Sequence, residues 1–218
     1  MPDPIDPSLF ETGYWDRTAW LKRFTHPLDS GLLAQHVPRQ ARMLDYGCGY
    51  GRVLGELVEM GYGRARGCDA SDRMIDRART EFPGLELHHV AGLPLPFDDA
   101  SHGAVVLFSV LTCVLEDEAQ RRLVAELLRI LEPGGVLYVS DLLLQEDERN
   151  RARYDREGLE GLPYGCFQTP DEARFRHMTP AWLEQLFEGL VRIHARELTV
   201  KTMNGNSARA FQWMLRKP

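Results

Sequence analysis

Long apolar runs, paired cysteines and lysine-rich stretches are all missing from this sequence of 218 residues. No apolar run of about 18 residues or more occurs, so no membrane-spanning helix is expected. The opening residues, MPDPIDPSLF, show no basic segment followed by an apolar run, which argues against a secretory leader. The cysteines, Cys48, Cys68, Cys113 and Cys166, form no C-x-x-C pair, so we expect neither a zinc site nor a disulfide framework. These absences predict a metal-free protein of the reducing cytoplasm.

The charged residues argue against a nucleic-acid partner. Acidic residues outnumber basic ones by 32 to 26, which gives a formal net charge of −6. The lysines are confined to Lys22, Lys201 and Lys217, and the arginines are interleaved with acidic residues. Because binding to a phosphate backbone requires a basic face or stripe, we expect a small-molecule partner instead.

The hydrophobic pattern predicts strands that alternate with helices. Strands are expected over residues 41–46, 66–70, 85–90, 103–110 and 136–141, and helices over 52–60, over 118–131 and after an N-cap at Ser71. The fourth strand, GAVVLFSV, is apolar almost throughout, as expected for a strand buried on both faces. This alternation predicts a doubly wound α/β domain over residues 1–218, with a mostly parallel seven-stranded sheet and helices on both faces.

Three segments depart from the alternation. Residues 1–40 are expected to form a helical cover that is broken near His26. Residues 142–177 form a long connection at the carboxyl edge of the sheet, which is typical of a lid or an acceptor-binding insertion. After a helix capped by Thr179, the segments RIHARELTV and RAFQWML flank an Asn-Gly turn and predict a C-terminal antiparallel hairpin.

The segment MLDYGCGYG, residues 43–51, raises the question of which ligand the first strand binds. A dinucleotide fingerprint would need a glycine three residues after Gly49, where the sequence has Arg52. A pyrophosphate would also be repelled by the carboxylate of Asp45 in a crevice of low dielectric constant. The glycine turn therefore favours a ligand that approaches the main chain closely and does not present phosphates.

A ligand that joins an amino acid to a nucleoside resolves this conflict. Asp45 can attract an ammonium group, directly or through water, while Gly47 and Gly49 let the main chain approach. The N-terminus of the following helix favours a nearby carboxylate. Asp69, at the end of the second expected strand, is placed to accept hydrogen bonds from ribose hydroxyls. S-adenosylmethionine meets all of these requirements.

Four motifs in order resemble the class I S-adenosylmethionine-dependent methyltransferases, in particular the small-molecule group that includes the quinone-biosynthesis enzymes. The motifs are DYGCGYG (45–51), DASDRM (69–74), LPFDDAS (95–101) and EPGG (132–135). The resemblance implies an S-adenosylmethionine-binding set of Tyr14, Asp45, Tyr46, Gly47, Gly49, Asp69, Ala70, Met74, Gly92, Leu93, Phe108 and Ser109.

Within that set, the resemblance implies a contact for each part of the cofactor. The main chain at Phe108 and Ser109 would meet the ammonium group, and Asp69 would hold the ribose. Ala70 and Met74 would lie against the adenine. The family often has an Asp near Ala91 that recognises the adenine amino group, and its absence here predicts weaker recognition by side chains at that edge.

Transfer of a methyl group from a sulfonium requires alignment of the acceptor in a dry pocket more than it requires a fixed catalytic group. A general base is needed only when the acceptor must lose a proton, and the sequence indicates none. The acceptor-site candidates are Asp141, Tyr154, Tyr164 and His177. Tyr14, Tyr154 and Tyr164 are also candidates for cation–π contact with the sulfonium. Oxygen, nitrogen, carbon and sulfur acceptors all remain open.

Three alternatives remain beside methyl transfer to a small molecule. An NAD-dependent oxidoreductase would have G-x-G-x-x-G and Tyr-x-x-x-Lys motifs, which the sequence lacks. Methyltransferases that act on base amines resemble one another in a D/N-P-P-Y/F motif, where residues 108–111 read FSVL. A protein that binds S-adenosylmethionine without catalysis is compatible with the same residues, because this fold depends little on fixed catalytic groups.

Overall fold

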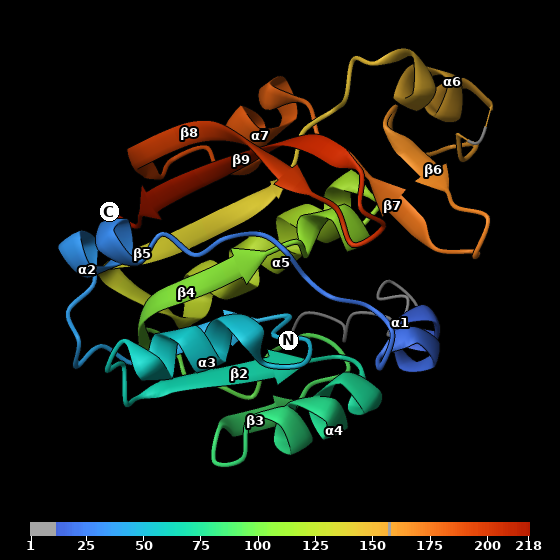
Figure 1. Cartoon of the computed structure of the whole chain (residues 1–218). Helices are drawn as coiled ribbons and strands as arrows, with labels where there is room; N and C mark the ends of the chain where they lie inside the picture. The colour runs from blue at the N-terminus through green and yellow to red at the C-terminus, as the bar shows by residue number, and fades with distance from the viewer. Residues whose placement is uncertain (1–11, 157) are drawn as a thin grey trace.

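The computed structural model describes residues 12–156 and 158–218, which contain a seven-stranded sheet of order β3-β2-β1-β4-β5-β9-β8 (Figure 1). The strands are β1 (Met43–Tyr46), β2 (Ala65–Asp69), β3 (Glu86–His89), β4 (His102–Phe108), β5 (Leu131–Leu142), β8 (Val191–Lys201) and β9 (Ser207–Arg216). Strands β1 to β5 are parallel, and β9 runs antiparallel to both β5 and β8. The predicted fold class and the C-terminal hairpin are therefore confirmed.

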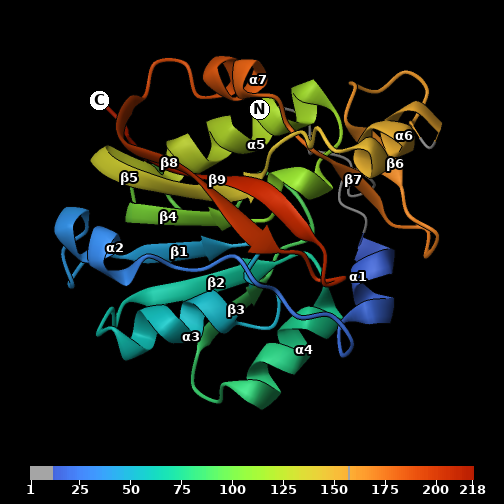
Figure 2. The same ribbon diagram turned by 45° about the horizontal axis from the view of Figure 1, so that its top comes forward.

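Helices cover both faces of this sheet (Figure 2). One face carries α2 (Ser30–His36), α3 (Arg52–Glu59) and α4 (Asp72–Glu81), and the other carries α5 (Asp117–Ile130) and α7 (Pro180–Leu186). Strand β4 packs against both layers, since Val105 and Leu107 join the cluster of α5 and α7 while Ala104 and Val106 join that of α2 and α3. The continuous apolar run of β4 follows from this burial on both faces.

Two predicted helix starts are confirmed by their caps. The hydroxyl of Ser71 accepts a hydrogen bond from the backbone N–H of Met74, and that of Thr179 accepts one from the N–H of Trp182. The predicted end of α5 is wrong in detail, because the helix ends at Ile130 and the Pro133–Gly135 segment lies within the span of β5. Leu131 already has an extended backbone and pairs with β4, so the strand begins before the proline.

The N-terminal cover is only partly helical. It contains α1 (Thr12–Thr18) and α2, and the chain between them is not helical, while residues 1–11 lie outside the described residues. The guanidinium of Arg77 on α4 anchors the connecting chain, since Nη1 donates to the carbonyls of Ala19 and Lys22 at 2.6 and 2.8 Å. The same guanidinium lies 3.9 Å above the ring of Tyr50. This segment is therefore held in place without periodic secondary structure.

The segment 142–177 contains α6 (Glu148–Arg156) and a small two-stranded sheet of β6 (Cys166–Gln168) and β7 (Arg174–Arg176). These elements lie beyond the carboxyl ends of the parallel strands, on the same side of the molecule as α1 (Figures 1 and 2). The role of the segment 142–177 as a lid stays a prediction. Among the described residues, no helix is both long and apolar enough to cross a membrane.

A short 3-10 helix, η2 (Leu111–Cys113), follows β4 and depends on one buried side chain. The amide nitrogen of Gln120 donates to the carbonyls of Leu111 and Val114, and its oxygen accepts from the indole N–H of Trp182. We expect Gln120→Leu to lower the free energy of unfolding by about 2–4 kcal/mol, because buried polar groups lose their partners. Urea unfolding measures this change.

The matched control for this prediction is Gln185→Leu, because Gln185 is exposed on α7. Its effect should stay within about 0.5 kcal/mol. Equal free energies of unfolding for both variants would contradict the account of Gln120.

Candidate active site

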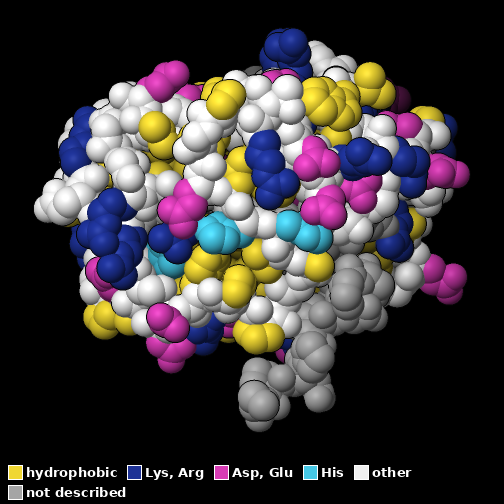
Figure 3. All heavy atoms as spheres, turned by 90° about the horizontal axis from the view of Figure 1, so that it is seen from below, with side chains coloured by type: hydrophobic (Ala, Val, Ile, Leu, Met, Phe, Trp, Pro, Cys, Tyr) yellow, Lys and Arg dark blue, Asp and Glu magenta, His cyan; other side chains and the backbone are white. Residues whose placement is uncertain are grey.

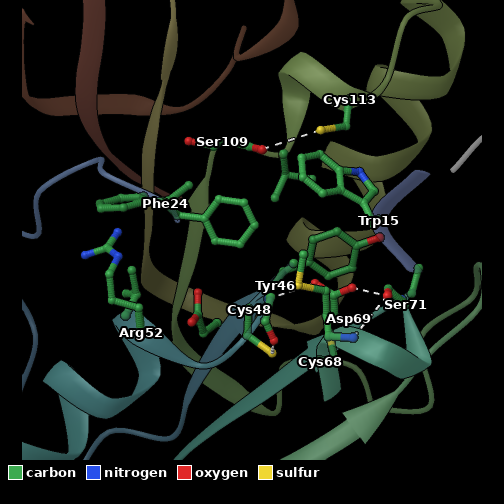
Figure 4. Close-up of a pocket in the computed structure, with 18 of the residues that line it drawn as sticks. Trp15, Phe24, Tyr46, Cys48, Arg52, Cys68, Asp69, Ser71, Ser109 and Cys113 are labelled. Atoms are coloured by element: carbon green, nitrogen blue, oxygen red, sulfur yellow. Dashed lines mark hydrogen bonds between the residues drawn. The ribbon is translucent and has the colours of Figure 1, made fainter. Parts of the chain in front are cut away.

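A cavity opens at the carboxyl ends of β1, β2 and β4. The order of the strands reverses here, because β2 and β3 lie on one side of β1, and β4 and β5 lie on the other. Such switch points are the usual ligand sites of open α/β sheets. The cavity spans about 960 Å³ of empty space, including the open space at its mouth. Figure 4 shows the side chains that surround it, and we call it the cofactor cavity.

The turn from β1 into α3 forms the floor of the cofactor cavity. Gly47 and Gly49 have φ values of +69° and +55°, in the left-handed region that favours glycine. A Cβ atom at Gly49 would overlap the ring of Phe24, so this position also needs the absence of a side chain. The N–H groups of Gly47 and Cys48 both donate to the carbonyl of Cys68, which fixes the turn to the end of β2.

Asp45 brings a buried carboxylate to this floor. Burial raises the pKa of Asp45 to about 7, and the nearby Arg52 opposes part of that increase. Its Oδ2 atom is buried and has no hydrogen-bond partner among the described residues. An unpaired carboxylate oxygen in a cavity fits a cationic donor from a ligand, such as the ammonium group of S-adenosylmethionine.

Asp69 lies across the cavity at the end of β2. Its Oδ2 accepts from the N–H of Gly49 and its Oδ1 from that of Ser71, both at 2.8 Å (Figure 4). Burial raises the pKa of Asp69, while these two N–H groups act in the opposite direction. Because each carboxylate oxygen can accept a further hydrogen bond, Asp69 can hold the glycine turn and ribose hydroxyls together.

Aromatic rings from the N-terminal cover form the upper wall. Trp15 and Phe24 contact each other edge to face, with ring centroids 5.7 Å apart, and Phe24 stacks on Tyr50 at 5.3 Å. Trp15 projects into the cavity opposite Asp69 and Ser71 in Figure 4. The cover therefore supplies apolar surface for a planar ligand.

Nine of the twelve predicted cofactor residues line the cofactor cavity, namely Asp45, Tyr46, Gly47, Gly49, Asp69, Ala70, Met74, Phe108 and Ser109. Tyr14, Gly92 and Leu93 do not line it. The hydroxyl of Tyr14 points instead to Asp171 at 3.0 Å, and Leu93 is buried in the core. Trp15, the next residue after Tyr14, lines the cofactor cavity instead.

A second cavity, which we call the acceptor cavity, adjoins the first and encloses about 820 Å³ with its open space. Four residues line both cavities, namely Trp15, Phe24, Ser109 and Cys113. The remaining wall comes from the N-terminal cover at Thr25 and His26, from Thr112, from the insertion, and from the β8–β9 turn with the start of β9. Lys22 joins these parts, since its Nζ donates to Asp171 of the insertion and to Asn204 of the turn, at 3.2 Å each.

Of the four acceptor-site candidates, His177 alone lines the acceptor cavity. The expectation that Asp141 faces it is wrong, because this buried carboxylate accepts from the N–H groups of Thr112 and Leu142. Burial raises the pKa of Asp141 to about 7. Tyr164 is exposed with its ring edge against Tyr154, and Tyr154 is buried with its hydroxyl 2.6 Å from Nδ1 of His177. The tyrosines predicted to contact a sulfonium line neither cavity.

The sequence interpretation missed several lining residues. In the cofactor cavity these include Phe24 and Cys113, and in the acceptor cavity His26, Arg149 and Arg153. Phe24 and His26 lie in non-helical chain, where no periodicity marks a buried side chain. The spacing of Arg149 and Arg153, four residues apart, was the one available signal, since it places both on one face of a helix. No group of three or more His, Cys, Asp or Glu side chains suited to a metal occurs in the described parts of the chain.

The fold and the cofactor cavity define an α/β protein that binds a nucleoside with a cationic group. Comparison with known families agrees, since residues 44–139 match the family described as a methyltransferase domain. Residues 44–139 thus match a methyltransferase domain, and the relatives and solved structures support a class I S-adenosylmethionine-dependent methyltransferase with S-adenosylmethionine as its cofactor.

Among curated relatives, a probable S-adenosylmethionine-dependent methyltransferase of Mycolicibacterium smegmatis is 35% identical over 136 residues, 62% of this chain and 48% of the relative. A demethylmenaquinone methyltransferase of Chlorobaculum parvum is 30% identical over 107 residues, 49% of this chain and 43% of the relative. This chain thus spans about half the length of the curated relatives it matches. A crystal structure of an S-adenosylmethionine-dependent methyltransferase from Methanosarcina mazei has a TM-score of 0.76 at 25% identity, covering 85% of this chain and 96% of that one.

The relatives do not agree on the acceptor. The Chlorobaculum parvum protein is compatible with the expected quinone-biosynthesis-like group, but tRNA methyltransferases and a ribosomal protein methyltransferase are also relatives. The comparisons therefore leave the acceptor open among small molecules, tRNA and protein.

Asp69 gives the first prediction for this site. We expect Asp69→Ala to weaken S-adenosylhomocysteine binding by about 1–3 kcal/mol, or roughly 5- to 150-fold, because ribose hydroxyls lose a charged acceptor. The melting temperature of the ligand-free protein should also fall, since the N–H groups of Gly49 and Ser71 lose their partner. Calorimetric titration and thermal unfolding measure the two effects.

The control is Asp98→Ala, because Asp98 is exposed and lines neither cavity. It should bind the ligand like the unaltered protein. A dissociation constant left unchanged by Asp69→Ala would remove Asp69 from the cofactor site.

Proposed function

We propose that this chain transfers a methyl group from S-adenosylmethionine to a small-molecule acceptor in the cytoplasm. The observation that carries the proposal is that the two cavities meet at Ser109 and Cys113. The cofactor cavity is lined by buried acidic groups, and the described lining of the acceptor cavity has none. In-line displacement needs donor and acceptor sites that meet at one point, out of bulk water. The N-terminal cover and the insertion serve as the walls of a single catalytic unit.

Residues of the cofactor cavity have separate roles in this proposal. Asp45 attracts the ammonium group, Asp69 accepts from the ribose, and Met74 and Trp15 pack against the adenosine. When bound, the cofactor supplies a methyl group on a sulfonium, which is already activated for transfer. The chain then has to hold the acceptor and keep water out, which the aromatic rings of the cover favour.

The shape and charge of the molecule support a small acceptor. The acceptor cavity is walled by the cover, the insertion and the β8–β9 turn, an enclosure suited to a compact molecule. The chain is acidic overall, and acidic and basic side chains are interspersed on the face formed by β3 and α4 (Figure 3). Neither feature favours a phosphate backbone.

The test is thermal unfolding with S-adenosylhomocysteine, S-adenosylmethionine and NAD in parallel. A ligand at about 100 times its dissociation constant adds about 2.7 kcal/mol, or roughly 5–10 °C for a chain of this length. Shifts with the two sulfur ligands alone would support the proposal. A shift with NAD alone would overturn it, and sulfur-ligand binding without turnover of any acceptor, tRNA included, would favour a non-catalytic binding protein.

The pH dependence of cofactor binding gives a further prediction. Below pH 7 a carboxyl group with a pKa of about 7 is increasingly protonated, and a neutral Asp45 no longer attracts an ammonium group. The affinity for S-adenosylhomocysteine should therefore fall as the pH falls from 8 to 5, by up to about tenfold for each pH unit below 7. Titrations across this range measure the slope.

Asp45→Asn is the control for this prediction, because it removes the titrating group and keeps the shape of the side chain. The variant should bind weakly with a flat pH profile. Asp141, whose pKa is also raised to about 7, is unchanged in this variant. Any effect of Asp141 on the pH profile would therefore still be seen. An equal slope in both proteins would contradict the role of Asp45.

A further inference from the structure

The acceptor cavity has the charge opposite to that of the cofactor cavity. Asp45, Asp69 and one basic residue, Arg52, line the cofactor cavity, whereas the described residues that line the acceptor cavity include Arg149 and Arg153 and no acidic side chain. The two arginines stand four residues apart and therefore lie on the same face of α6. This asymmetry indicates which charge each ligand carries.

His177 lies beside both arginines. Its imidazole is buried, and burial, assisted by Arg153 and Arg149, lowers the pKa of His177 to about 3. The side chain is therefore neutral at physiological pH. The two guanidinium groups add to the effect of burial, and Asp147 opposes it, so positive charge outweighs negative charge around this imidazole.

The hydrogen bonds of His177 decide which ring nitrogen can meet a ligand. The oxygen of the Tyr154 hydroxyl accepts from the N–H of Gln145 at 3.1 Å, and the same hydroxyl lies 2.6 Å from Nδ1 of His177. Donation of its single hydrogen to Nδ1 satisfies the hydroxyl and places the imidazole proton on Nε2. His177 then offers a donor to the cavity, and its role is to bind rather than to remove a proton.

Among the described residues, one acidic neighbour of this set is already engaged. Asp147 accepts from both the backbone N–H and the side-chain amide of Asn150, at 3.1 and 2.6 Å. Its Oδ1 atom is 4.0 Å from Nε of Arg149, at the outer limit of an ion pair. This contact uses one of the five N–H donors of Arg149, so donors remain for a ligand.

Aromatic rings complete the cavity. Phe167 and Phe175 line it on the side of the insertion, and Trp15 and Phe24 line it toward the cofactor cavity. The guanidinium of Arg153 lies 4.6 Å over the ring of Phe167, which positions the charge at the edge of the apolar wall. A flat ligand with one charged end fits these walls.

We propose that the methyl acceptor is a planar aromatic compound that carries a carboxylate or phosphate group, bound by Arg149, Arg153 and His177. The ring lies between the aromatic side chains, and the anionic group points to α6, away from the junction with the cofactor cavity. This inference rests on the proposed methyltransferase function, and it narrows the acceptor to one chemical class.

The experiment is calorimetric titration of the full chain saturated with S-adenosylhomocysteine. The probes are 2-naphthoate, 2-naphthyl phosphate and the neutral 2-naphthamide, which share the ring system and differ in the charged group. We expect at least one anion to bind about tenfold or more tightly than the amide, because guanidinium groups form charge-assisted hydrogen bonds with it. The better of the two anions identifies the natural group.

Variants on α6 complete the design. The double variant Arg149→Gln and Arg153→Gln should reduce the preference for the anion to below about threefold and leave S-adenosylhomocysteine binding unchanged. Arg151→Gln is the matched control, since Arg151 is exposed on the same helix, lines neither cavity and carries the same charge. It should keep the preference.

Each outcome is informative. Failure of S-adenosylhomocysteine to bind would overturn the proposed function itself. With that ligand bound, equal binding of the three probes, or no binding of any, would overturn the anionic acceptor alone. A preference that survives the double variant, or that Arg151→Gln also removes, would mean that the anion binds elsewhere.

Discussion

The described structure depends on the connection between the ends of β1 and β2. Two N–H groups of the glycine turn bind the carbonyl of Cys68, and a third binds the carboxylate of Asp69. These bonds set the height of the turn above the sheet and the direction in which α3 leaves it. The same bonds aim Asp45 and Asp69 at one space, so a single backbone arrangement provides both the topology of the first crossover and the polar groups of the cofactor cavity.

Most of the sheet could be predicted from the sequence because its signals are local. The apolar run of β4, the hydroxyl caps at Ser71 and Thr179, and the Asn-Gly turn of the hairpin each act within a few residues. The start of β5 was misplaced for the same reason. Leu131 pairs with His102 of β4, and the regular pairing resumes at Val136 after an irregularity that contains the Pro-Gly-Gly segment. The pairing of Leu131 joins residues far apart in the sequence, so no local signal marked it.

Site residues at the ends of strands were predicted from the sequence, whereas those placed by tertiary packing were missed. Asp45 and Asp69 end neighbouring strands, and parallel strands bring their carboxyl ends together. Phe24 is held at the glycine turn by contacts between residues far apart in the sequence. Arg77 binds carbonyls of the segment that carries Phe24, and the backbone N–H of Phe24 donates to the hydroxyl of Tyr50. Tyr14 and Trp15 are adjacent in sequence, and the direction of α1, which its sequence does not encode, decides that Trp15 meets the cavity.

The shared wall of the two cavities has a thermodynamic consequence. Trp15 and Phe24 line both spaces, so a ligand that orders these rings from one side also shapes the site on the other. Coupling of this kind is reciprocal, because each ligand changes the affinity for the other by the same factor. Binding of an acceptor in one cavity would therefore change the affinity of the other cavity for the cofactor. In the proposed reaction, departure of one product would therefore change the affinity for the other by that factor.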